Sequence, residues 1–276
     1  MKRIDSHQHF WKFDPVRDSW INDEMNLIQR DFLPQDLEPF LKQNGFEGCV
    51  VIQSDQSYEE NRFQLQNAAD NGLVKGIVGW VDLMSPHVEK DLEFLKQFSK
   101  IKGFRHVLQG EKQRDLMLHS SFMNGVSLLQ KYSFTYDILI FKDQLQYIPK
   151  FVSSFPEQGF VIDHIAKPDI KKGDINEWKK DIGKVAQFEN VYCKISGMVT
   201  EADWEKWKKE DFKPYMDVVV DTFGIKRIMF GSDWPVCLVA ASYSETLSIV
   251  EDYFSSFSKN EQEQFFGLNA ALFYNL

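Results

Sequence analysis

Two histidines near the start of the chain have the spacing of a metal-chelating pair. They lie in the motif His7-Gln8-His9, with Asp5 two positions earlier. Alternate side chains of an extended strand point to the same face. We therefore expect both imidazoles to share a face with Asp5, while Ile4 and Phe10 pack under helices on the other face. Two neutral imidazoles on one face can chelate a divalent metal, although this spacing by itself is a weak signal.

A third histidine and a further carboxylate lie at the ends of two later apolar runs. His164 closes the run Val161-Ile162-Asp163-His164, and Asp233 follows Met229-Phe230-Gly231-Ser232. Three imidazoles and a carboxylate suit a mononuclear metal site, and the carboxylate can also accept a proton from water. The alternatives are a hydrogen-bonded core histidine for His164 and a turn-capping carboxylate for Asp233.

Short apolar runs that alternate with amphipathic stretches must position these side chains. The predicted strands are 3–9, 47–54, 74–83, 101–109, 134–140, 159–165, 191–197 and 227–233. The predicted helices include 58–71, 87–98, 121–131, 176–188, 213–223 and 243–257. Strands alternating with helices imply a parallel sheet, and the first strand is followed by no Gly-rich phosphate loop, which favours a closed barrel over an open sheet.

We therefore predict an α/β fold, a (β/α)8 TIM barrel, as one domain over residues 1–276 with a long aromatic loop at 10–33 after strand one. Active sites of such barrels lie at the C-terminal ends of the strands. His7, His9, His164 and Asp233 are expected together at that rim.

Composition narrows the class of partner. The formal net charge is −9 and the chain has no basic stripe, which argues against nucleic acid. No apolar stretch approaches the length of a membrane span, and the first residues lack the apolar core of a signal peptide. Three widely separated cysteines fit a reducing compartment. These features predict a cytoplasmic protein that acts on a small molecule.

Several sequence blocks, in order along the chain, resemble the amidohydrolase superfamily and specifically its sugar-lactonase-like branch, which includes L-fuconolactonases, L-rhamnonolactonases and 4-sulfomuconolactonase. The blocks are Asp5-Ser6-His7-Gln8-His9-Phe10-Trp11, Lys102-Gly103-Phe104-Arg105-His106, Thr135-Tyr136-Asp137, Asp163-His164-Ile165-Ala166-Lys167-Pro168, Lys194-Ile195-Ser196-Gly197, Gly231-Ser232-Asp233-Trp234-Pro235, Asn269-Ala270 and Phe273-Tyr274.

The resemblance implies Asp233 as general base, with His7, His9 and His164 facing a metal or the substrate carbonyl. Binuclear relatives use a bridging carboxylate, often a carbamylated lysine, on strand four and a histidine on strand five. This chain instead has Arg105-His106 and Tyr136-Asp137 there. We expect one divalent metal, zinc in the first instance, held by His7, His9, His164 and Asp233, with a metal-free variant as the alternative.

Further polar and aromatic side chains suit a sugar lactone. Arg105 could donate paired hydrogen bonds to a carbonyl or to hydroxyls, or form an ion pair at the rim. Lys194 is either a substrate donor or half of a buried pair. We expect Asp233, His164 and Arg105 to be catalytic. The expected substrate-binding residues are Arg105, His106, Lys194, Trp234, Trp11 and Tyr136, although large aromatic side chains are more often simply packed.

The expected reaction is hydrolysis of an aldonolactone such as L-fucono- or L-rhamnonolactone. The first alternative is a non-oxidative decarboxylase of the same superfamily, which has a similar constellation. The second is a non-catalytic barrel that serves in binding or assembly.

Overall fold

The computed structural model describes residues 3–276 and contains one parallel sheet of eight strands in the order β1 to β8. The strands are β1 (Arg3–Gln8), β2 (Phe46–Ile52), β3 (Val74–Gly79), β4 (Ile101–His106), β5 (Thr135–Ile138), β6 (Phe160–Ile162), β7 (Val191–Ile195) and β8 (Ile228–Phe230). Each lies within or overlaps one predicted strand. The predicted (β/α)8 barrel is confirmed.

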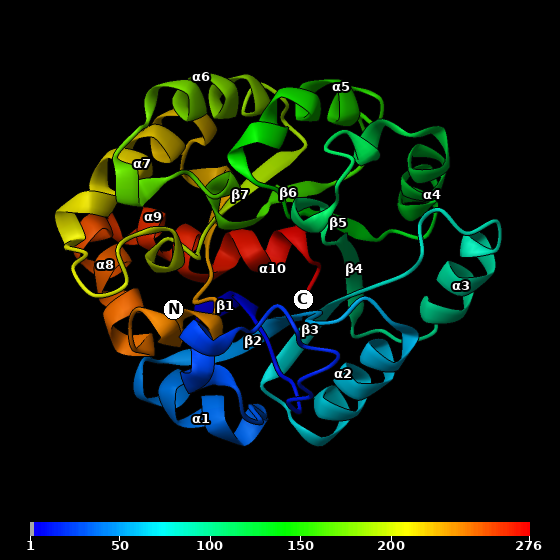
Figure 1. The fold of residues 1–276 in the computed structure, drawn as a ribbon, viewed down its shortest axis with the longest axis horizontal. Helices are drawn as coiled ribbons and strands as arrows, with labels where there is room; N and C mark the ends of the chain where they lie inside the picture. The colour runs from blue at the N-terminus through cyan, green and yellow to red at the C-terminus, as the bar shows by residue number, and fades with distance from the viewer. Residues whose placement is uncertain (1–2) are drawn as a thin grey trace.

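Helices surround the sheet, as Figure 1 shows. They are α1 (Pro34–Gln43), α2 (Tyr58–Asp70), α3 (Val88–Leu95), α4 (Ser120–Lys131), α5 (Ile148–Ser153), α6 (Asn176–Val185), α7 (Lys209–Phe223), α8 (Tyr243–Phe254), α9 (Lys259–Glu263) and α10 (Asn269–Phe273). No helix within residues 3–276 is both long and apolar enough to cross a membrane.

The barrel closes where the first strand meets the segment after the last. The backbone N–H of Asp233 donates to the carbonyl of His7 at 2.8 Å, and that of His9 donates to the carbonyl of Trp234 at 2.7 Å. Both bonds involve residues of the predicted site. Closure of the sheet therefore fixes the backbone that carries His7, His9 and Asp233.

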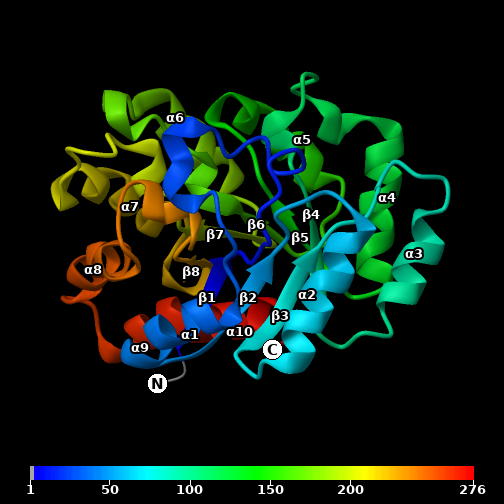
Figure 2. The ribbon, with the colours of Figure 1, turned by 60° about the horizontal axis from the view of Figure 1, so that its bottom comes forward.

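Two apolar regions hold the barrel together. The larger lies between sheet and helices, and the smaller fills the interior with Ile4, Val50, Ile52, Val78, Val161 and Met229. Ala270, in α10, and Tyr274, directly after it, belong to the same interior cluster and close one end of it. Figure 2 shows α10 lying across the end of the barrel where the strands begin. The opposite rim is left for the site.

The strict alternation predicted for the first strand is wrong at Ile4 and Asp5. Ile4 lies inside the barrel, whereas Asp5 accepts hydrogen bonds from the Ser232 N–H at 2.9 Å and from the Tyr243 hydroxyl of α8 at 3.3 Å. Pairing with β2 shifts register between Asp5 and Gln8. Asp5 therefore does not share a face of the strand with His7 and His9, whose Nε2 atoms lie 3.2 Å apart.

Candidate active site

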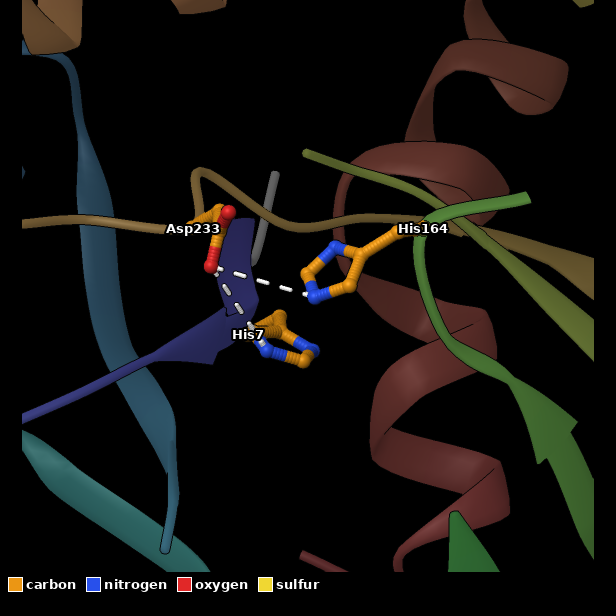
Figure 3. Close-up of side chains that lie close together, drawn as sticks. All are labelled: His7, His164 and Asp233. Atoms are coloured by element: carbon orange, nitrogen blue, oxygen red, sulfur yellow. Dashed lines mark ion pairs between the residues drawn. The ribbon is translucent and has the colours of Figure 1, made fainter. Parts of the chain in front are cut away.

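The four predicted metal ligands converge at the C-terminal rim. One ligand atom each from His7, His164 and Asp233 lies within 4.8 Å of the others, and Figure 3 shows the three side chains pointing toward one another. Nε2 of His9 lies 3.2 Å from Nε2 of His7 and 3.4 Å from Oδ1 of Asp233. The four side chains predicted as ligands therefore lie close together at one rim.

Each of the three imidazoles is held through its Nδ1 atom. In His9 this atom faces the Ile52 carbonyl at 2.9 Å, and in His164 it faces the Ser196 hydroxyl at 2.9 Å. In His7 it lies 3.2 Å from Oδ1 of Asp163 and 3.3 Å from Nζ of Lys194. Such outer partners fix ring orientation and leave Nε2 as the ligand atom. Three Nε2 atoms and a carboxylate oxygen are a donor set that fits a divalent metal.

The electrostatics favour the protonation states that metal ligands need. Burial lowers the pKa of both His7 and His164 well below the usual value, so both rings are neutral near pH 7. Burial raises the pKa of Asp233, but His164, His9 and the charge of Lys167 lower it, and the net pKa lies below its usual value. Asp233 is therefore a carboxylate beside neutral imidazoles.

A buried group of charges lies beneath these ligands. Nζ of Lys194 contacts Asp137 at 2.5 Å and Asp163 at 3.0 Å, while Nη1 of Arg105 contacts Asp163 at 3.0 Å. The Tyr274 hydroxyl donates to Asp137 at 2.7 Å. Although burial opposes ionisation of Asp163, Lys194 holds the pKa of that carboxyl well below its usual value. The cluster fixes both Arg105 and the ring of His7.

A cavity of about 370 Å³ opens above the ligands, a size suited to a small organic molecule. Its wall includes ligand residues, the strand-four arginine and side chains of several loops. The lining residues are His9, Arg17, Trp20, Gln53, Ser54, Asp55, Gln56, Arg105, Val107, Gln109, Gly110, Leu139, His164, Lys167, Asp233 and Val236. Arg17 and Trp20 show that the long loop after β1 contributes to this wall.

Of the residues expected to bind substrate, Arg105 lines the cavity and the other five do not. Nε2 of His106 lies 2.8 Å from Oε1 of Glu111 and so secures the loop that carries Gln109 and Gly110. Lys194 is fully buried as half of an ion-paired cluster, one of its two expected roles.

The three aromatic side chains expected to bind substrate are packed in the core. Trp234 and Trp11 are 1% exposed, and both rings pack edge-on against Phe32. Tyr136 is fully buried and packs against phenylalanines on the helix side of the sheet. Alternation along β5 takes Tyr136 outward, since the neighbouring Asp137 contacts Lys194 inside the barrel.

Sequence reasoning missed several residues of the cavity wall. Arg17, Gln56 and Lys167 line it but were not singled out as binding residues. Lys167 lies in one of the blocks that carried the family resemblance, which was an available signal. Arg17 and Gln56 lie in loops whose conformation the pattern of apolar residues does not predict.

Known proteins of the same family resemble this chain along its whole length. Proteins named L-fucono-1,5-lactonase from Burkholderia multivorans and Burkholderia ambifaria are 36% and 34% identical to it, and each match covers 99% of this chain and 96% of the relative. A crystal structure of an amidohydrolase from Burkholderia multivorans with bound zinc has a TM-score of 0.97 and 36% identity, with 100% of both chains covered. The model of the amidohydrolase family matches residues 4–276. The family model and these relatives, together with the fold, show that the chain belongs to the amidohydrolase family.

Proposed function

We propose that this protein hydrolyses a sugar lactone, with an L-fucono-1,5-lactone as the first candidate substrate. The two relatives of that name are 36% and 34% identical to this chain over nearly the full length of both proteins. The observation that carries the proposal is a carboxylate, Asp233, that faces the rings of His7, His9 and His164 beside a cavity of substrate size.

One divalent metal, which we propose is zinc, would be held by His7, His9, His164 and Asp233. The zinc-bound relative supports this identity. Bound there, the metal would supply Lewis acidity toward the lactone carbonyl and toward water. The chain's own residues provide orientation, charge and proton transfer.

Asp233 is the proposed general base. Its contacts with His7, His9 and His164 all use Oδ1, so Oδ2 is the oxygen that can accept a proton from the attacking water. The ring C–O bond of the tetrahedral adduct then breaks, and Asp233 returns the proton to the departing ring oxygen. Its lowered pKa keeps it ionised and ready to act at neutral pH.

Arg105 is the proposed electrophilic partner of the carbonyl. Nη2 donates to the Gln53 carbonyl at 2.6 Å and Nη1 to Asp163 at 3.0 Å, so the guanidinium is held rigidly at the base of the cavity. Its position lets it stabilise negative charge that develops on the carbonyl oxygen. A strained or activated ester needs less electrophilic help than an amide, which suits a site with one metal.

A panel of L- and D-aldonolactones, assayed with a pH indicator before and after chelator treatment, tests the proposal. We expect acid release from lactones with the L-fucono configuration. Loss of carbon dioxide from aromatic acids, without acid release from any lactone, would favour the decarboxylase alternative. If the metal-loaded protein acts on neither lactones nor aromatic acids, the alternative of a non-catalytic barrel is favoured.

A further inference from the structure

A lysine on the cavity wall, Lys167, pairs with Glu201 rather than with Asp233, although its charge contributes to the lowered pKa of that carboxyl. Lys167 ends a run of left-handed residues after β6, in which His164, Ile165, Ala166 and Lys167 have φ angles of 54°, 48°, 59° and 48°. Left-handed backbone is costly for residues other than glycine and is typically kept where function requires it. This turn brings both His164 and Lys167 to the cavity.

The ammonium group of Lys167 is incompletely paired. Its nearest anion is Oε1 of Glu201 at 3.4 Å, and its nearest aromatic ring is Phe141, with 5.5 Å to the centroid. A charge-assisted hydrogen bond is usually 2.7–2.9 Å long, so this contact is loose. Both side chains are largely buried, with 16% and 20% exposed, and Lys167 lies beside the cavity rather than in bulk solvent.

The other cations of the cavity wall are more firmly engaged. Arg105 is fixed by Asp163 and Gln53, and Arg17 donates to both oxygens of Asp18 at 2.8 and 2.7 Å. Among residues 3–276, Lys167 is thus the cation of the wall with the longest contact to its acidic partner. It is the one best placed to pair with an anion that enters or forms in the cavity.

The proposed reaction forms such an anion. Water adds its oxygen to the carbonyl carbon, the ring C–O bond breaks, and the ring oxygen leaves with a proton. The resulting carboxylic acid then releases a proton near pH 7 and carries one negative charge. The lactone is neutral, so a nearby ammonium discriminates between product and substrate mainly through charge.

Resting on the proposed lactonase function, we propose that Lys167 binds the carboxylate of the opened sugar acid and that Glu201 competes for the same ammonium. Lys167 is then a product-binding residue that sets how strongly the sugar acid inhibits the enzyme. Glu201 limits that binding because the product must displace it.

The test compares binding of L-fuconate with use of L-fucono-1,5-lactone in the full-length protein. In Lys167→Gln, the inhibition constant of L-fuconate should rise about tenfold, while KM for the neutral lactone changes less than about threefold. Lys167→Arg should restore much of the product affinity. Glu201→Gln should shift the inhibition constant in the opposite direction, toward tighter binding.

Lys171→Gln is the matched control, because Lys171 belongs to the same loop region but is 63% exposed and pairs with Asp203 outside the cavity. It should change neither constant. An equal rise in KM and in the inhibition constant of Lys167→Gln would show that Lys167 binds hydroxyl groups shared by lactone and acid. An unchanged inhibition constant would show that Lys167 serves only to pair with Glu201. Either outcome overturns the proposal.

Calorimetric titration with L-fuconate separates this inference from the proposed function. Wild-type protein that binds L-fuconate through Lys167 but opens no lactone would remove the lactonase proposal and leave the carboxylate site in place. If the protein opens the lactone but Lys167→Gln binds L-fuconate as tightly as wild type does, the lactonase proposal stands and the role of Lys167 is removed. Absence of both turnover and binding would remove both proposals.

Discussion

Oδ1 of Asp163 lies 3.2 Å from Nδ1 of His7, although His7 belongs to β1 and Asp163 follows β6. The residue that follows Asp163 is His164, itself a candidate ligand. One short segment after β6 thus supplies a ligand and also orients the ligand of β1. Lys194 pairs with the same Oδ1 atom at 3.0 Å, which ties the orientation of His7 to a buried ion pair.

Lys194→Met should be strongly destabilising, because it leaves Asp137 and Asp163 buried without their shared cation. Breaking a buried pair by removing one partner typically costs about 3–5 kcal/mol. Urea unfolding at pH 7 measures the loss. The double variant Lys194→Met/Asp137→Asn should recover part of it, and Lys171→Met should be neutral. A loss in Lys194→Met no larger than in Lys171→Met would contradict the assigned pairing.

Asp233→Asn should lower kcat on the order of 10² or more, since the amide keeps the size of the side chain but cannot accept a proton from water. The wild-type pKa is below its usual 3.8, so loss of this base should not limit activity at pH 5. Stopped-flow measurement of acid release gives kcat for both proteins. A variant that keeps more than about a third of wild-type kcat would remove Asp233 from the role of base.

Metal content should not exceed one equivalent per chain. Among residues 3–276 the grouped ligand atoms form a single cluster, and β4 ends in Arg105 and His106, so that no lysine lies at the C-terminal end of this strand to bridge a second ion. Elemental analysis of protein purified without added metal measures the ratio. Two tightly bound equivalents would be incompatible with this site, and full activity without metal would favour the variant in which Arg105 and the histidines act alone.

Ser196→Ala should weaken metal binding by about 10- to 100-fold, because it removes the hydroxyl partner of His164 Nδ1. Competition with a chelating dye gives the affinity independently of turnover. Ser6→Ala is a matched control, since the Ser6 hydroxyl is also buried but donates to the Phe230 carbonyl and contacts no ligand ring. Similar affinities of the two variants would show that the His164–Ser196 contact does not orient the ring for metal.

Glu60→Gln should stabilise the protein at pH 8. Burial raises the pKa of Glu60 from 4.5 to about 7, so the folded state binds a proton that the unfolded state releases, and stability falls as pH rises between those values. All three hydrogen bonds to the carboxyl use Oε1, from the Ser54 N–H and hydroxyl and from Gln64, and glutamine retains that oxygen.

The gain at pH 8 should be at most about 3 kcal/mol, and it should shrink toward zero near pH 4.5. Thermal or urea unfolding of both proteins across this range tests the sign. A difference in stability that is independent of pH would show that Glu60 does not titrate with the raised pKa.

The fold was predictable because its pattern is repetitive. Each strand is a short apolar run whose ends are marked by polar or small residues, and the alternation with helical segments leaves few other topologies. The ligands were predictable for the same reason, since residues at strand ends converge at one rim whatever the loops do. The strand ends bring His7, His164 and Asp233 to this rim, whereas the exact direction of each side chain depends on the irregularity in β1 and on the left-handed residues after β6 and β8.

The remaining site residues depend on details that apolar patterning does not encode. The register shift near Asp5 changed which residues face inward, and the direction of Tyr136 depended on the pleat of a strand only four residues long. Lys167 reaches the cavity through a left-handed turn formed by non-glycine residues, for which the sequence has no local signature. The sequence could not place Trp11 and Trp234, because aromatic side chains suit both sugar binding and packing.

The seam between β1 and the segment after β8 also determines when the site can exist during synthesis. The Ser232 N–H bond to Asp5 joins residues 227 positions apart, and Asp233 meets His7 across the same seam. A nascent chain on the ribosome holds His7 and His9 from the outset but lacks their carboxylate partner until the last barrel strand has emerged. Metal loading is therefore expected to follow folding in this protein rather than to nucleate it, in contrast to small domains that fold around their ion.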